Sequence, residues 1–303
     1  MNEEITICEC IARMISHNFG TTLPAVKINT VSMHKPGRGP KTGLQLTSPG
    51  WKIAPVFYPE DFMPDGRDPE DLNVVDEADR DILFKVVDDM THEFIKAMED
   101  CENIDAADLI DGVKRGNLIA CVTSAARSAD MLQNMPHRIF LDLAVYARVI
   151  LLQDDDAGKQ MSMAVNYAAM NKLGMTEDEV IDSALENSRT QVGSRIKRMS
   201  EMIPESQAGD IEMTVLTNNK AMYGASVILD NEVLQAVAEI YGGDYYMLPS
   251  SVHELIAIPA DEDNLPGYRA MVSDINTNVV GDEATLSGNV YRWDSRANAV
   301  RIA

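Results

Sequence analysis

The stretch RIFLDLAVYARVILL, Arg138 to Leu152, decides how the second half of this chain folds. It is apolar for most of its length, and such a run is typical of a strand covered on both sides. We therefore expect a central strand that includes Phe140 to Val149. We also expect a single sheet for the chain from about Met135 onward.

Strand and helix patterns continue on both sides of this stretch. A strand is predicted at GNLIACVTSA (116–125) and a short helix at SADMLQNM (128–135), then a turn at QDDDAGKQ (153–160), a return strand at MSMAV (161–165), and helices at NYAAMNKLGM (166–175) and TEDEVIDSALENSRTQ (176–191). Thr176 lies three residues before Glu179, which is the spacing of a helix capping box.

The last hundred residues repeat a strand, strand, helix order. We expect a hairpin of GDIEMTVLT (209–217) and YGASVIL (223–229), a helix at DNEVLQAVAEIYG (230–242), strands at YYMLPS (245–250) and ELIAIPA (254–260), a helix at GYRAMVSDINTNV (267–279), and a closing pair of NVYRWDS (289–295) and AVRIA (299–303). Asp230 or Asn231 caps the first of these helices, and Gly242 ends it.

The N-terminal part begins with a helical pattern, followed by three short strands at VKINTVSMHK (26–35), TGLQLTS (42–48) and IAPVFY (53–58) with a turn at KPGRGPKTG (35–43). The longest helical pattern runs from Val75 to Met98. Its period predicts that Ile82, Val86, Met90 and Phe94 are buried while Asp79, Asp81, Asp88 and Asp89 face water.

Together these patterns predict an α+β protein with mostly antiparallel sheet and helices packed on one face. A chain of 303 residues is long enough for two modest units. We place an N-terminal α+β subdomain at 1–125, with the strand meander and the long acidic helix. A C-terminal α+β subdomain with a mixed or antiparallel sheet follows at 126–303.

The negative charge of the chain is concentrated in one segment. The formal net charge is −22, and residues 59–111 hold 19 acidic against 4 basic side chains, a net of −15. Direct binding of nucleic acid rests on Lys and Arg neutralising phosphates, so this distribution argues against it, and against an acidic membrane surface. The segment fits a basic protein partner, mimicry of nucleic-acid charge, or a solvated helix face.

Cysteine usage and the N-terminus indicate a cytoplasmic protein. The four cysteines (Cys8, Cys10, Cys101 and Cys121) form no C-x-x-C pair and lie at no metal-ligand spacing from a histidine, so we expect reduced thiols, no metal and no cofactor. The chain begins with acidic residues, unlike a secretory signal, and no apolar run is long enough to span a membrane. The sequence leaves the oligomeric state open.

The string LPSSVHE (248–254) holds the residue types of a hydrolase site: Ser250 or Ser251 as nucleophile, His253 as base and Glu254 as the orienting carboxylate. Their spacing along a strand disfavours local assembly, and no G-x-S-x-G turn is present. The plainer interpretation is a turn or bulge after Pro249 in which the hydroxyls bond backbone groups.

A second cluster is MPHR (135–138) with Asp142. These residues, His137, Arg138 and Asp142, could bind an anion or a metal together with His253. A metal site is disfavoured because the positive charge of Arg138 repels a cation and only one carboxylate is present. The alternative is that Arg138 pairs with an acidic neighbour. In the expected hairpin turn LTNNKAMYGA (216–225), Asn218 and Tyr223 are further candidate ligand-binding residues.

The order of MPHRIFLDLAVYARVIL, LTNNKAMYGASVIL, GGDYYMLPSSVHELIAIP and LSGNVYRWD resembles a bacterial, Firmicutes-type family, domain of unknown function 5688. A weaker similarity of the C-terminal half, around VLQAVAEIYGGDYYMLPSS, is to the YtpQ-like proteins, which lack the Ser-Ser-x-His-Glu string. The first family has no assigned activity, so the resemblance implies boundaries for the fold and no mechanism.

Two functional hypotheses follow. The first is a non-enzymatic interaction or regulatory protein with an acidic surface, which the absence of a recognisable catalytic set favours. The second is a small hydrolase or ligand-binding enzyme that uses the MPHR and PSSVHE clusters.

Overall fold

The computed structural model describes residues 6–20, 25–34, 40–49, 51, 54–64, 67–103, 113–154, 159–201 and 212–303. Contacts divide this chain into two units, the first formed by the described residues from 6 to 103 and the second by those from 113 to 303. The acidic stretch 104–111 and most of the two turns expected at 35–43 and 153–160 lie outside the described residues.

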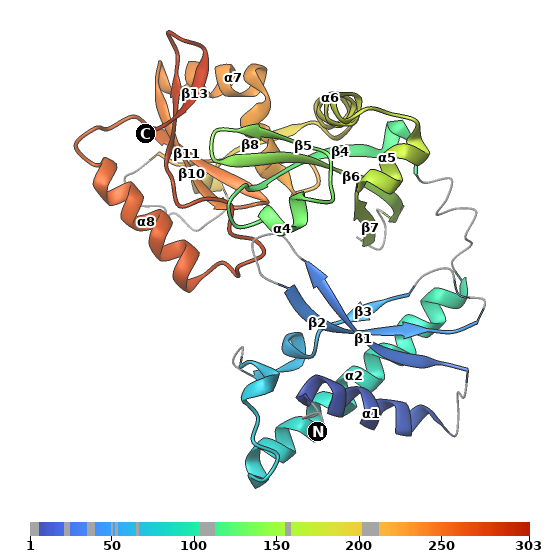
Figure 1. Ribbon diagram of the computed structural model, residues 1–303. Helices are drawn as coiled ribbons and strands as arrows, with labels where there is room; N and C mark the ends of the chain where they lie inside the picture. Colours follow the sequence, from blue (N-terminus) through green and yellow to red (C-terminus); the bar gives the residue numbers. More distant parts are fainter. Residues whose placement is uncertain are drawn as a thin grey trace. The chain divides into compact units, whose positions relative to one another are not determined.

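The first unit is a three-stranded antiparallel sheet with two long helices on one face (Figure 1). Its elements are α1 (Ile7–Gly20), β1 (Lys27–His34), β2 (Pro40–Thr47), β3 (Val56–Phe57), the 3-10 helices η1 (Pro59–Phe62) and η3 (Pro69–Asp71), and α2 (Glu77–Asn103). Strand β2 lies between β1 and β3, as expected of a meander.

Helix α2 packs one stripe of its surface against α1 and the sheet. The buried stripe consists of Leu83, Val86, Val87, Met90, Phe94 and Met98, with Ile82 partly buried beside them. Asp81, Asp88 and Asp89 are exposed, as predicted. Asp79 is partly buried, because its carboxylate accepts a hydrogen bond from the Arg67 guanidinium at 3.1 Å.

The second unit holds two sheets. Its elements are η4 (Arg115–Asn117), β4 (Leu118–Ser124), α4 (Ala129–Leu132), β5 (His137–Phe140), β6 (Leu143–Asp154), β7 (Lys159–Ala164), α5 (Tyr167–Leu173), α6 (Glu177–Asn187), the π-helical turn η5 (Ser188–Val192), β8 (Ser194–Arg198), η6 (Met199–Glu201), β9 (Thr214–Asn218), the 3-10 helix η8 (Gly224–Leu229), α7 (Asn231–Tyr241), β10 (Tyr245–Ser251), β11 (Glu254–Pro259), α8 (Leu265–Asn278), β12 (Tyr291–Asp294) and β13 (Ala299–Ile302).

Every strand pairing among the described residues is antiparallel. The larger sheet has the order β13-β12-β10-β11-β9-β8, and in the smaller one β4 and β5 flank β6 while β7 also pairs with β6. Because β4 pairs with β6 along its whole length, residues 118–124 lie with the second unit, whereas we expected a boundary at 125/126.

Both faces of the six-stranded sheet are covered. Tyr246 and Leu248 of β10 pack against α8, while Tyr245 and Met247, which alternate with them, pack against α7, η8 and the smaller sheet. This alternation is what a strand with period two requires. None of the described helices is both long and apolar enough to cross a membrane.

The expectation of one sheet from about Met135 is wrong, and so is the single strand over Arg138 to Leu152. The chain reverses at Leu141 and Asp142, where Leu141 has φ +56°, and the segment becomes the hairpin of β5 and β6. The central position is confirmed for Leu143 to Val149, since β6 has neighbours on both sides there.

The strand expected at YGASVIL is also wrong, because residues 224–229 form the 3-10 helix η8. A short buried apolar run does not distinguish a strand from a buried helix. Gly224 allows a close approach of the chain at this point, since a Cβ atom there would lie 2.6 Å from the Asn218 amide nitrogen and 2.6 Å from the His253 carbonyl oxygen. The chain therefore turns tightly against β9 before η8 begins.

Local helix signals are confirmed. Thr176 and Glu179 form the predicted capping box of α6, with the Thr176 amide donating to the Glu179 carboxylate at 2.8 Å. The Asp230 side chain caps α7, and Gly242 ends it with φ +74°. These signals depend only on neighbours in sequence, which is why they could be predicted.

Candidate functional site

The Ser-Ser-x-His-Glu string forms the turn between β10 and β11. The register shifts between Pro249 and Ser251, as a bulge does. The Ser250 hydroxyl donates to the Glu254 carboxylate at 3.1 Å, and the Ser251 hydroxyl accepts from the His253 amide at 3.0 Å. Both hydroxyls are thus engaged within the turn.

The His253 ring faces the loop that joins β9 to η8. Its Nδ1 accepts a hydrogen bond from the Tyr223 amide at 3.0 Å, and the two rings lie 5.5 Å apart. Burial lowers the pKa of His253 below its usual 6.5, and the nearby Glu254 carboxylate opposes this only in part. The imidazole is therefore neutral, with its proton on Nε2.

Asn218 and Tyr223 shape the same loop. The Asn218 side chain donates to the Met222 carbonyl at 2.8 Å and accepts from the Lys220 amide at 3.1 Å. Tyr223 takes the left-handed conformation with φ +56°, which aims its amide at the histidine. The fold thus brings three candidates, Asn218, Tyr223 and His253, into one place.

Sequence reasoning missed Arg148 as a part of this place. Its guanidinium carbon lies 4.9 Å from the centre of the Tyr223 ring, and its nitrogens donate to the Ser162 hydroxyl at 3.1 Å and to the Ser162 carbonyl at 2.9 Å. The Tyr223 ring thus contacts both Arg148 and the His253 ring, which is tilted from it by 44°. Cys121 on the neighbouring strand is fully buried, and burial raises the pKa of its thiol to about 12, so it is not nucleophilic.

The MPHR cluster lies elsewhere. Arg138 on β5 donates to Asp178 and to Asp182 of α6, both at 3.0 Å, and these bonds raise the pKa of the guanidinium. His137 Nδ1 lies 2.9 Å from the carbonyl of Met135. Arg138 therefore pairs with acidic neighbours, which was the plainer of the two sequence interpretations.

Asp142 is held by residues far along the chain. Its carboxylate accepts hydrogen bonds from the Ser287 hydroxyl at 2.7 Å, the Tyr291 hydroxyl at 2.8 Å and the Asn289 amide at 3.0 Å. Within the described residues no hydrogen bond or ion pair joins His137, Arg138 or Asp142 to His253. The two polar clusters are separate.

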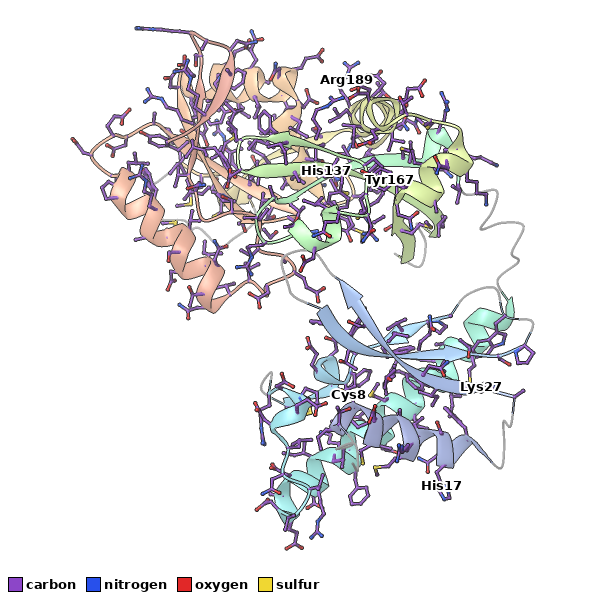
Figure 2. The ribbon with its side chains drawn as sticks, viewed as in Figure 1. Cys8, His17, Lys27, His137, Tyr167 and Arg189 are labelled. Carbon is purple, nitrogen blue, oxygen red and sulfur yellow. The ribbon has the colours of Figure 1, made fainter. Side chains whose placement is uncertain are left out.

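The second unit also contains a cavity of about 370 Å³. Its lining includes Ala120, Asp182, Leu185, Glu186, Ser188, Arg189, Gly193, Ser194, Asn218, Ser226, Val227, Leu229, Asp230, Asn231 and Glu232. Figure 2 shows Arg189 beside α6, on a different element from His137. No sequence motif marks this cavity, because its walls come from segments more than one hundred residues apart.

The first unit has a groove of about 660 Å³ along α2. Its apolar lining comes from Phe62, Met63, Pro64, Ile82 and Val86, and its charged and polar lining from Asp61, Lys85, Asp89, His92 and Glu93. Asp61 and Asp89 are exposed and lack a hydrogen-bonding or ion-pairing side chain among the described residues. In the described part of the chain, no group of three or more His, Cys, Asp or Glu could hold a metal ion.

The fold is of the α+β class, with antiparallel sheets in both units. A family model described as "Family of unknown function (DUF5688)" matches residues 6–295, so the chain belongs to this family, as its sequence suggested. No curated protein and no solved structure matches the chain, and nothing supports the weaker similarity to the YtpQ-like proteins.

Proposed function

We propose that this is a non-enzymatic cytoplasmic interaction protein that binds a basic protein partner through the acidic segment 59–111. The proposal rests on the groove along α2. Its lining combines the exposed carboxylates of Asp61 and Asp89 with apolar side chains, and also includes Lys85 and His92. Lys and Arg side chains have this same division, with an aliphatic stem and a charged head.

Part of the acidic charge serves the fold of the first unit. The Glu70 carboxylate accepts from the amides of Ile7 and Cys8 at 3.0 and 3.2 Å and so caps the start of α1. Asp79 pairs with Arg67, and Asp68 caps η3. These carboxylates are occupied and would contribute little to a partner.

The groove carboxylates differ from these. Asp61 and Asp89 are exposed, and Glu93 lies beside them with a salt bridge to Lys96 at 3.0 Å. A basic side chain in the groove would gain Coulomb attraction at the rim and would cover the apolar surface of Phe62 and Ile82. Charge complementarity of this kind raises association rates and selects against acidic partners.

The hydrolase hypothesis has less support. No hydrogen bond links Ser250 or Ser251 to the His253 imidazole among the described residues, and the histidine nitrogen that faces the loop is taken by the Tyr223 amide. A nucleophile and its base need such a bond.

Affinity purification from the native host tests the proposal, with the full chain as bait in three forms. These are the wild type, the groove variant Asp61→Asn/Asp89→Asn, and a matched control, Asp71→Asn/Asp81→Asn. In each variant one aspartate comes from a 3-10 helix and one from α2, and all four are exposed.

We expect one basic protein with the wild type and the control, and its loss with the groove variant. Equal recovery with all three baits, or a partner without a basic surface, contradicts the proposal.

A further inference from the structure

The cavity of the second unit has the free edge of strand β4 as one wall. Strand β4 is buried along its whole length, yet among the described residues only β6 pairs with it. A buried strand edge needs other partners for its backbone groups. The Ala120 amide donates to the Ser188 hydroxyl at 2.8 Å, and the Leu118 carbonyl accepts from the Asn187 side chain at 3.1 Å.

The carbonyl of Ala120 faces the same edge. Ala120 lies opposite Ala147 in the ladder, and the Ala147 carbonyl accepts from the Val165 amide on the other side of β6. The two alanines are therefore a non-hydrogen-bonded pair, and both polar groups of Ala120 point away from β6. Ala120 is only 3% exposed and lines the cavity. In the described part of the chain its carbonyl has no hydrogen-bond donor, although buried carbonyls seldom lack one.

A cation of the protein itself, Arg189, bridges two carboxylates of the lining. Arg189 donates to Glu186 of α6 at 3.0 and 3.2 Å and to Glu232 of α7 at 3.4 Å. Arg189 lies in the π-helical turn η5, and such turns recur at functional sites. This ion pair shows that a guanidinium fits between the two carboxylates.

The rest of the lining defines the ligand further. Leu185, Val227 and Leu229 give the cavity apolar walls. The N-terminus of α7 would favour an anion, but the Asp230 carboxylate already accepts from the amides of Glu232 and Val233 at 3.1 and 3.4 Å. An anion would therefore find this helix terminus already capped, while the carboxylates of Glu186 and Glu232 favour a cation.

We propose that this cavity binds a small guanidinium or ammonium compound, with its N–H groups on the Ala120 carbonyl and on Glu186 and Glu232, and its aliphatic stem against Leu185 and Val227. In the ligand-bound state Arg189 gives up its place between the two carboxylates. The site is distinct from the groove along α2 and does not depend on the function proposed for that groove.

Calorimetric titration of the full chain with argininamide tests this site. Citrullinamide is the matched probe, because it has nearly the same shape and the same α-amino group but a neutral urea in place of the guanidinium. We expect argininamide to bind and citrullinamide to bind at least about tenfold more weakly, the ratio that loss of one charge-assisted hydrogen bond produces. Arg189→Ala removes the internal competitor and should tighten argininamide binding several-fold, which no loss of folding can imitate.

The variant Glu186→Gln/Glu232→Gln should lose argininamide binding by about tenfold or more. The control Glu177→Gln/Glu239→Gln removes the same charge from the same two helices, outside the cavity lining, and should bind like the wild type. Absence of argininamide binding, equal binding of the two probes, or equal affinity of all the variants would overturn the assignment.

Discussion

The candidate polar side chains that the sequence marks in the two units differ in what they contact. In the second unit the candidate residues are engaged by their own fold, from the Ser250 and Ser251 hydroxyls in their turn to Asp142 with its three donors. In the first unit, Asp61 and Asp89 stand exposed at the rim of a groove. Residue types that look catalytic can thus be structural, and a charged helix face can be the part left available for binding.

The substitution with the largest expected effect on stability tests how α2, which lines the groove, packs in the core. Val86 is 1% exposed on the buried stripe of α2, so Val86→Asp places an unpaired charge in the core. We expect a loss of about 4 kcal/mol in the free energy of unfolding, measured by urea denaturation. Asp81→Val on the exposed face is the control and should change it little. A wild-type midpoint for Val86→Asp means that α2 does not pack as described.

Substitution of Asp142 tests whether the candidate polar residues of the second unit stabilise its fold. Asp142→Ala leaves the hydroxyls of Ser287 and Tyr291 and the amide of Asn289 without their acceptor. Because Ser287 and Tyr291 are buried, we expect a loss of about 3 kcal/mol in the free energy of unfolding. Tyr291→Phe in the same background separates the cost of its orphaned hydroxyl. An Asp142→Ala variant as stable as the wild type would refute this role.

Removing the hydroxyls of Ser250 and Ser251 should lower the free energy of unfolding less than removing the Asp142 carboxylate, since their hydrogen bonds are local and partly exposed. We expect Ser250→Ala/Ser251→Ala to lower the free energy of unfolding by about 1–2 kcal/mol. A probe that reacts with activated serines gives the contrary outcome. Modification of Ser250 or Ser251 by this probe would identify a nucleophile and support the hydrolase hypothesis.

The pH dependence of stability gives a smaller effect with a defined sign. Burial lowers the pKa of His253 in the folded state below the 6.5 of the unfolded chain, so the unfolded state binds the proton more readily. The stability due to neutral His253 is present above pH 6.5 and is lost as the pH falls through the folded-state pKa. His253→Gln should flatten that slope of the unfolding free energy. An unchanged slope would show that His253 does not titrate as described.

The contrast between the units also explains which features could be predicted from the sequence. The capping box of Thr176 and Glu179 and the caps of α7 depend on residues within one or two turns of helix, and they are confirmed. The stripe of α2 is confirmed for Val86, Met90 and Phe94, whereas Ile82 and Asp79 are both partly buried. The reversal at Asp142 could not be predicted, since its partners lie about 145 residues further along the chain.

The contacts of Tyr223 with Arg148 and His253 likewise join three separate segments. The cavity lined by Ala120 of β4 could not be predicted either, because its lining also comes from separate segments. In addition, the hydrogen-bond acceptor that Ala120 offers is a backbone carbonyl, which no residue type marks in a sequence. By contrast, the acidic concentration in 59–111 could be read directly from composition, although its division into capping and exposed carboxylates could not.

The most direct test of the groove as a docking site is the affinity of the full chain for a short peptide that alternates lysine and leucine. This affinity is measured by fluorescence anisotropy at low and at physiological ionic strength. If the groove is the docking site, Asp61→Asn/Asp89→Asn binds this peptide about tenfold more weakly than the wild type, with a smaller dependence on salt. We expect Asp71→Asn/Asp81→Asn to bind like the wild type, and both variants to unfold at the wild-type urea midpoint. Equal peptide affinities for the two variants would contradict the groove as the docking site.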